Sequence, residues 1–464
     1  MVVKCYRCIL EQSNLTYKDE GEVDEFIDEI ENLKASGGGD CPEYTFNGMI
    51  AAIEEGPELG SPLIVFTDAP PKDADENDNL NGLIALAGEN EVNINFFTHE
   101  TCDSFPFKGF ELFKQLSAET GGQYLPMEEY ELRSLAKFTD AKLGTLAAVK
   151  TGESVARTRR RRSTVDEILI ALDDTVDRLV VSTTTENSAT DVSLRAPSGI
   201  AWDEGKNIMT NAAVYIVDLP ADGDWKLEVP VSAGEYRYSV KVSSKENINF
   251  KHDFKKSVNR RKVDLKYPLA GEQAEVELRM AGEKQIKKDS LRVDIVDTSG
   301  EVLIPDLKPT PNGADGVYFT VTFNPPKEKF KMMLKGMTKK NKVFTRVSER
   351  PDEVKPLVLK KFYNSRGDFI RPGGSVFLML YLFNGKDSNQ VFRISFKDTL
   401  GYSISLLGRR RLTARARSKK YLRVAVRYGG GKRGREGQNE NVIILVKGPD
   451  GSIATEVVPL MVKS

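Results

Sequence analysis

The chain has 464 residues, of which 40% are hydrophobic, so it is too long for one ordinary domain and apolar enough to build several cores. Its formal net charge of -1 indicates no unusual partner. The charge is uneven, however: residues 1–150 carry about 11 Lys and Arg against 29 Asp and Glu, and residues 351–464 about 22 against 9. This asymmetry favours contact between the two ends or separate basic and acidic partners, although independent drift of two domains gives the same pattern.

Two kinds of segment are missing from the sequence. No run of 18 apolar residues is present, so we expect no transmembrane helix. The first residues, MVVKCYRCIL, lack the apolar region and cleavage site of a signal peptide. Taken alone, this start favours the cytosol.

The first 150 residues alternate between strand and helix patterns. Helical spacing of apolar residues, buried apolar runs and a closing Gly pair mark these elements. Strands are expected in VKCYRCIL, NLTYKD, SPLIVFTDA, VNINFFTH and QYLPM, and helices in EVDEFIDEIENL, NLNGLIALAG, GFELFKQLSAETGG and EYELRSLAKFTDAKLG. A further helix is expected to start near Tyr44, where Phe46, Met49, Ile50 and Ile53 have helical spacing. This order predicts a doubly wound α/β sheet with helices on both faces.

From about residue 165 the pattern changes to short alternating runs that are separated by Gly, Pro and Asp. Such runs, 8–12 residues apart in the first set, are typical of an antiparallel sandwich. The pattern occurs in three successive sets, with boundaries near residues 158, 260 and 350. We therefore predict a multidomain chain: an α/β domain over 1–157, followed by all-β sandwich domains over 158–260, 261–350 and 351–464.

Two segments resemble a known family. GGGDCPEYTFNGMIAA (37–52) and SPLIVFTDAPPKD (61–73), with the order of elements around them, resemble a von Willebrand factor A (vWA) domain of the hemicentin type. The later segments NIMTNAAVYIVDLPADGDWKLEV, YSVKVSSKENINFKHDF, YPLAGEQAEVELRM and FKMMLKGMTKKNKVFTRVS look like the β domains that follow that A domain. The resemblance covers most of residues 1–350 and, more loosely, the last domain. It implies Ig-like β domains over 261–350 and 351–464.

The resemblance implies a divalent cation, Mg²⁺ or Ca²⁺, held by three loops at the carboxyl ends of the strands. Asp68 matches the aspartate of the third loop, and Glu43 matches an acidic ligand of the second loop. Asp40 would serve a neighbouring cation or cap the helix that starts near Tyr44. Each of the three carboxylates also fits a plain turn or capping role.

The first metal loop of the family, Asp-x-Ser-x-Ser, does not occur upstream of Gly37. We therefore expect an A domain truncated at its N-terminus, without the family's first strand. That strand lies in the middle of the sheet, and each buried backbone group left unpaired would cost about 1–3 kcal/mol. The sequence thus favours a fragment, or a half-domain that is loose or completed by another chain, with a metal site that is weak or absent. A fragment would also explain the missing signal peptide.

The resemblance also places cysteines at Cys41 and Cys102, and it implies a disulfide between them and an oxidising compartment. The pair Cys5-x-x-Cys8 has no second pair with which to form a zinc site.

Three short motifs are candidates for recognition or processing. RTRRRRS (157–163) reads as a solvated linker or as a proprotein-convertase site cleaved after Arg162. Arg366-Gly367-Asp368 is the tripeptide that integrins recognise, and we expect it on an exposed turn. A basic set would bind sulfated glycans or form a solvated basic face; it comprises Arg409, Arg410, Arg411, Arg415 and Arg417. Aromatic residues do not interleave with these bases in the sequence, which argues against nucleic-acid binding.

Nothing in the sequence indicates catalysis. The two histidines, His99 and His252, fall in different domains without a matched nucleophile, and the glycines of 37–39 lack the lysine of a phosphate-binding loop. We therefore expect a non-enzymatic, secreted protein of the extracellular matrix or of cell adhesion that binds protein partners. The alternative is an intracellular scaffold that uses the same modules without metal.

Overall fold

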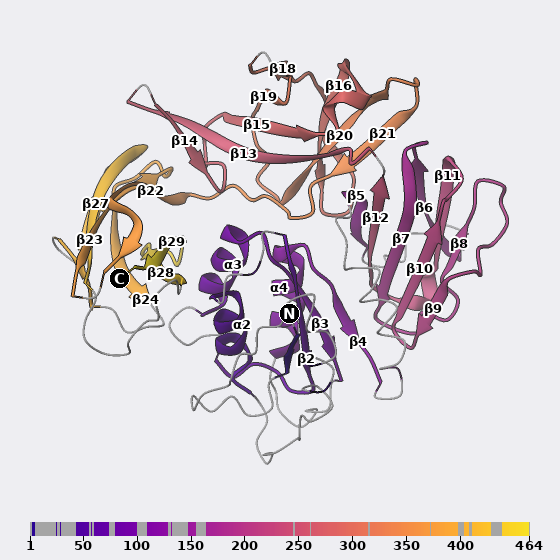
Figure 1. Cartoon of the computed structure of the whole chain (residues 1–464), viewed down its shortest axis with the longest axis horizontal. Coiled ribbons are helices and arrows are strands. Elements are labelled where there is room, and N and C mark those ends of the chain that lie inside the picture. The colour runs from indigo at the N-terminus through magenta and orange to yellow at the C-terminus, as the bar shows by residue number, and fades with distance from the viewer. Residues whose placement is uncertain are drawn as a thin grey trace.

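The computed structural model of the chain describes most of its residues. The described residues are 2–4, 25, 28, 43–54, 57, 60–73, 79–99, 109–128, 131, 147–154, 164–244, 246–259, 261–313, 316–371, 373–397, 403–407, 411–427 and 439–463. They form one α/β unit and three β units (Figure 1). No helix in this part of the chain is long and apolar enough to cross a membrane.

The α/β unit is a parallel sheet with three helices. Its strands β1 (Val2–Lys4), β2 (Pro62–Thr67), β3 (Asn93–Thr98) and β4 (Tyr124–Pro126) pair in the order β1-β2-β3-β4. The helices are α2 (Thr45–Glu54), α3 (Asn79–Glu89) and α4 (Gly109–Thr120). The predictions for these three helices and for β2, β3 and β4 are confirmed. The glycine predicted to close α4 is Gly121, whose φ of 74° is the left-handed conformation that glycine adopts without strain.

The two faces of this sheet are covered differently. Side chains alternate along each strand, so Leu63 and Phe96 point to one face and Ile64 and Phe97 to the other. The first face packs against α2, α3 and α4. The second packs against the first β unit, where Val214 joins the same cluster. Among the described residues, a β-sheet therefore lies on this second face. The other two helices expected in the α/β unit, EVDEFIDEIENL and EYELRSLAKFTDAKLG, lie almost wholly outside the described residues.

The edge of β2 that was expected to lack a partner is paired. Val2 lies opposite Ile64, Val3 opposite Val65 and Lys4 opposite Phe66, in parallel register. The first strand pattern of the chain thus supplies backbone hydrogen bonds to β2, and no vacant edge is present between these two strands.

The first β unit contains two antiparallel sheets around one core. The sheet orders are β5-β12-β7-β10-β9 and β6-β11-β8, and buried side chains from both sheets form one cluster. The strands are β5 (Ala147–Ser154), β6 (Val165–Leu172), β7 (Val176–Thr185), β8 (Ser193–Arg195), β9 (Lys206–Met209), β10 (Ala212–Asp218), β11 (Gly223–Pro230) and β12 (Tyr236–Ser244), with a 3-10 helix at Val231–Ala233. Because β5 pairs with β12, this sheet begins ahead of the boundary expected near residue 158.

The second β unit is built in the same way. Its sheets have the orders β14-β13-β15-β19-β18 and β17-β16-β20-β21, and they share one core. The elements are β13 (Asn249–Val258), β14 (Arg261–Leu265), β15 (Ala274–Ala281), a 3-10 helix (Glu283–Gln285), β16 (Ile286–Asp297), β17 (Val302–Leu307), β18 (Thr310–Pro311), β19 (Tyr318–Phe323), β20 (Phe330–Thr338) and β21 (Val343–Val347).

The last β unit is a single eight-stranded sheet that folds over one core. Its order is β25-β27-β23-β22-β29-β28-β24-β26. The long strand β22 links the two halves, because it pairs with β23 along most of its length and with β29 at its end. The strands are β22 (Leu357–Ile370), β23 (Ser375–Asn384), β24 (Gln390–Lys397), β25 (Ser403–Leu406), β26 (Arg411–Ala414), β27 (Ser418–Arg427), β28 (Asn439–Lys447) and β29 (Ile453–Val462).

The three β units arch around the α/β unit, with the first and the last β unit on opposite sides of it (Figure 1). On the helical side, Ile443 and Leu445 of β28 and Val457 of β29 join the core formed by the helices and the sheet. The α/β unit therefore lies between two β units that are far apart in the sequence.

Candidate functional site

The structure brings two of the predicted metal loops together at the carboxyl edge of the α/β sheet. After β2 ends at Thr67, the Thr67 hydroxyl donates to the Ala69 carbonyl oxygen at 3.0 Å and fixes the turn that carries Asp68. The loop then runs beside the segment that precedes α2. The Glu43 amide donates to Pro70 O at 2.9 Å, and the Lys72 amide donates to Glu43 O at 2.8 Å.

A residue that the sequence reasoning missed, Asp73, holds these loops against α2. Its carboxylate accepts from the amides of Phe46 (3.2 Å) and Asn47 (2.8 Å), which lie in the first turn of that helix. Asp73 is fully buried, and its backbone oxygen accepts from Asn79 at the start of α3. The helix is therefore capped from the neighbouring loop, a long-range arrangement that local capping rules do not detect.

The described residues alone do not supply a complete cation site at this edge. Asp68 is exposed and Glu43 is partly buried. Among the residues that the structure describes, no group of three or more His, Cys, Asp or Glu side chains is arranged to hold a metal. Mg²⁺ and Ca²⁺ take about six or more oxygen ligands, whereas Asp73 uses its oxygens to cap α2. Asp40, the third predicted ligand, lies outside the described residues.

Several other predicted residues also lie outside the described part of the chain. They are Cys41 and Cys102 of the predicted disulfide, Arg162 of the predicted cleavage site, and Arg409 and Arg410 of the basic set.

The integrin-type tripeptide lies within a strand instead of on the expected turn. Arg366, Gly367 and Asp368 are part of β22. Gly367 is exposed, and its φ of 66° bends the strand between the part that pairs with β23 and the part that pairs with β29. The prediction of a turn is therefore wrong, because the left-handed glycine bends β22 without ending it.

The three arginines of the basic set that the structure describes differ in their contacts. Arg411 and Arg415 are exposed on β26 and just after it. Arg417 is engaged: its guanidinium donates to Asp387 Oδ1 at 2.7 Å and to the backbone oxygen of Ala270 in the second β unit at 2.6 Å. The hydrogen bond from Arg417, together with its positive charge, lowers the pKa of the Asp387 carboxyl. Arg417 therefore joins two units.

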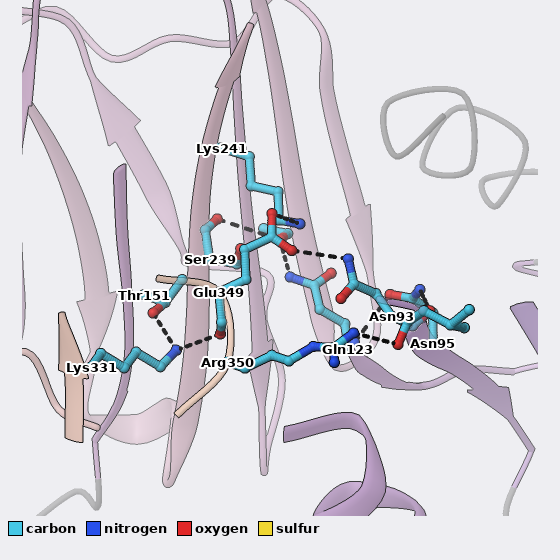
Figure 2. Close-up of polar contacts among 11 residues, drawn as sticks. Asn93, Asn95, Gln123, Thr151, Ser239, Lys241, Lys331, Glu349 and Arg350 are labelled. Carbon is cyan, nitrogen blue, oxygen red and sulfur yellow. Dashed lines mark hydrogen bonds and ion pairs between the residues drawn. The ribbon is translucent and has the colours of Figure 1, made fainter. Parts of the chain in front are cut away.

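A second polar centre lies where the α/β unit meets the first and second β units (Figure 2). Glu349, just after β21, accepts from Lys241 of β12 and from Asn93 of β3, each at 2.9 Å. Its backbone oxygen accepts from Lys331 of β20 at 3.0 Å, and Lys331 also donates to Thr151 of β5 at 2.7 Å. One residue thus links three units.

Next to Glu349, cations cap the C-terminal end of α3. Arg350 donates to the backbone oxygens of Ala87 (3.2 Å) and Val92 (3.0 Å), and Lys266 donates to that of Ala85 (2.9 Å). Positive charge is favourable at a helix C-terminus. Burial, and then the nearby charge of Arg350, lower the pKa of Lys266 to about 8.

A cleft of about 610 Å³ opens at the same junction, between α4 and the two β units. Two contacts across its lining join neighbouring units: Lys329 binds Glu119, and Arg237 donates to the backbone oxygen of Lys114. These contacts hold the α/β unit to the first and second β units.

The parallel sheet, its helices and the two loops at its carboxyl edge define a vWA domain, and residues 16–129 match the family described as von Willebrand factor A domain. Over 342 residues the chain is 26% identical to mouse Hemicentin-2, covering 70% of this chain and 6% of that protein. It is 22% identical over 392 residues to rat von Willebrand factor A domain-containing protein 7, covering 77% of this chain and 42% of that protein. The chain is therefore a vWA-containing, hemicentin-like protein.

The chain spans less than half the length of these relatives. Among solved structures, Escherichia coli alpha-2-macroglobulin activated by porcine elastase matches 65% of this chain and 33% of its own, at 12% identity and a TM-score of 0.22. That score is too low to support an argument about the fold.

Proposed function

We propose that the protein is secreted and acts in the extracellular matrix or in cell adhesion by binding protein partners through its vWA domain. The match to the A domain and the likeness to hemicentins support an interaction role of this type at the level of the family. The second and last β units would act as Ig-like modules that hold the A domain in a fixed frame.

One observation on the A domain supports the binding surface in particular. The first β unit and the helices cover the two faces of its sheet, whereas side chains at the carboxyl edge stay accessible. Asp68 is exposed there, and His99 pairs with Glu128 at 3.2 Å while both side chains are nearly half exposed. We assign the partner surface to this edge.

The proposal includes a weak cation site and no catalysis. Asp68 and Glu43 would hold Mg²⁺ or Ca²⁺ weakly, because two carboxylates fall short of the usual oxygen set. A Cys41–Cys102 disulfide would fit secretion. A non-enzymatic role is consistent with the contact that each histidine makes with a carboxylate, His99 with Glu128 and His252 with Asp352.

Retention in matrix tests the interaction role. The purified full chain is added to cell-free matrix laid down by cultured fibroblasts, and the fraction that resists washing is measured. We expect retention that falls when the matrix is treated with trypsin and when Asp68→Ala is combined with Glu128→Ala. Exposed Asp203→Ala, on the first β unit, is the matched control. Retention that is unaffected by the edge variants would overturn the assignment of the surface.

Calorimetry tests the cation separately. Mg²⁺ or Mn²⁺ titrated into the chain should bind weakly, and Asp68→Asn should abolish that binding. Binding that persists in Asp68→Asn, or no binding to the wild-type chain, would refute the cation site.

A further inference from the structure

The outer face of the last β unit carries the exposed aromatic side chains of the described chain. All five aromatic residues among the exposed large hydrophobics lie in this unit; they are Phe362, Tyr363, Phe369, Phe377 and Tyr421. Soluble proteins seldom expose such residues together without a binding role. The concentration of aromatic rings on one unit therefore calls for a functional explanation.

All five residues lie on the three neighbouring strands β22, β23 and β27, but Phe369 is on the part of β22 that pairs with β29. Tyr381 of β23 lies opposite Tyr421 of β27, with ring centroids 5.1 Å apart, and Phe362 of β22 stacks on Tyr381 at 3.9 Å. One step further along the sheet, Tyr363 lies opposite Met379. Paired residues on adjacent strands point to the same face, so the rings form one platform. The second β unit covers part of it, because Tyr381 is buried in the core of that unit and Tyr421 accepts a hydrogen bond from Asn259 at 3.3 Å, whereas Tyr363 and Phe377 are exposed.

Positive side chains border this platform. Arg423 of β27 lies opposite Met379, and Arg427 lies opposite Ser375, on the same face as the rings. The two arginines are four residues apart, which is about 13 Å along a strand. Both are exposed, and neither has an ion pair within the described residues.

The strands that form the platform carry almost no negative charge. The sequence has no Asp or Glu between Asp398 and Glu436, a stretch that contains β25, β26 and β27, and β23 has none either. In Figure 1, β23 and β27 lie on the side of the last unit away from α2 and α3, whereas β28 and β29 lie toward those helices. The part of the face that the second β unit leaves exposed is therefore basic and aromatic, and it lies away from α2 and α3.

We propose that this face, defined by Tyr363, Phe377, Tyr421, Arg423 and Arg427, binds a sulfated polysaccharide chain. The arginines would pair with sulfate groups through two parallel hydrogen bonds each. The rings offer flat apolar surfaces on which the C–H faces of sugar rings pack. The inference rests on the proposed extracellular function for the choice of a glycan, and it moves the glycan site from the predicted arginine set to the outer face of β27.

The structure weakens one argument against nucleic-acid binding, namely that no aromatic residue lies between the basic residues. On the outward side of β27 the order is Lys419, Tyr421 and Arg423, so an aromatic residue does lie between bases once the strand alternation is taken into account. Single-stranded nucleic acid uses the same combination of stacking and charge. It therefore serves as the competing ligand in the test.

The test measures binding of the full chain to immobilised heparin, to chemically desulfated heparin and to a single-stranded oligothymidylate, at two salt concentrations. We expect binding to heparin that weakens with salt, and at least tenfold weaker binding to the other two ligands. Arg423→Gln combined with Arg427→Gln should weaken heparin binding about tenfold, which corresponds to roughly 1.4 kcal/mol. Tyr363→Ser should weaken it about fivefold.

The matched control is Arg411→Gln combined with Arg415→Gln, which removes the same charge from two exposed arginines on and just after β26, at the other end of the sheet order. It should change the affinity less than twofold. An equal loss in the control would refute a defined site in favour of general charge attraction, and an oligothymidylate that binds as tightly as heparin would refute the glycan. Because heparin is a purified ligand, a failure of heparin binding would refute the glycan site alone. The proposed binding to matrix proteins is tested separately by the trypsin-sensitive retention in matrix.

Discussion

Replacing Arg346 by methionine should destabilise the junction of the first and second β units more than other single changes there. Arg346 Nη1 lies 2.9 Å from Asp173 Oδ2, and both side chains are 1% exposed. Arg346 also donates to Ile248 O at 2.8 Å, and Thr175 donates from its amide to Asp173. Removing one partner of a buried ion pair leaves an uncompensated charge, which costs about 3–5 kcal/mol.

The chain offers a local probe for this measurement. Its two tryptophans, Trp202 and Trp225, both lie in the first β unit with ring centroids 5.5 Å apart, so tryptophan fluorescence in urea follows the unit that contains Asp173. With a slope of about 2 kcal/mol per M, the loss moves the midpoint down by about 2 M. Arg346→Met combined with Asp173→Leu should recover much of this loss, because two apolar side chains replace the pair.

Arg178→Met is the control for this prediction. Arg178 forms an ion pair with Asp218 in the same unit at 2.8 Å, but both side chains are exposed, and such pairs contribute about 1 kcal/mol or less. An Arg346→Met midpoint no lower than that of Arg178→Met would refute the argument from burial.

Three further changes test other contacts. The pKa of Lys266 is lowered to about 8 in the folded chain, so between pH 8 and 10.5 the unfolded chain binds a proton that the folded chain does not. Over this range the unfolding free energy of the wild type should rise by up to about 3 kcal/mol relative to that of Lys266→Met. Urea titration followed by circular dichroism measures the difference. Burial disfavours the charged form of His252, but Asp352 outweighs it and raises the pKa, so the stability advantage of the wild type over His252→Gln should be complete below pH 6.5 and fall as the pH rises further; a pH-independent difference would contradict this. Asp73→Ala should cost about 1–2 kcal/mol and speed amide hydrogen exchange in the first turn of α2, with Asp68→Ala as the unaffected comparison.

The sequence was sufficient to predict the elements whose pattern is local. The spacing of Phe46, Met49 and Ile53 predicts α2, and the apolar runs ending at Thr67 and Thr98 predict β2 and β3. Periodicity reports only that a side chain is buried. It does not name the covering element, which is why the β-sheet on the second face of the A domain was not predicted.

In the candidate site, too, some features were predicted from the sequence and others were not. The two loops that carry Glu43 and Asp68 were predicted to meet, and their backbones are hydrogen bonded at Pro70 and Lys72. The cap from Asp73 was missed because the acceptor and the helix are far apart in the sequence. The tripeptide at Gly367 was predicted to lie on an exposed turn, whereas the left-handed glycine bends β22 without ending it.

The position of the A domain between two β units has a consequence for how the chain is made. During synthesis β2 and β3 emerge early, whereas Ile443 and Leu445, which cover α2 and α3, emerge more than 300 residues later. At about 5–20 residues per second, that interval lasts on the order of half a minute. During this interval the apolar side chains of α2 and α3 that pack against β28 and β29 remain exposed, because those strands have not yet been synthesised. The α/β unit is thus translated ahead of the three β units but is completed only with the last of them, and a ribosome that stalls in the last β unit releases a chain whose α2 and α3 still expose apolar surface.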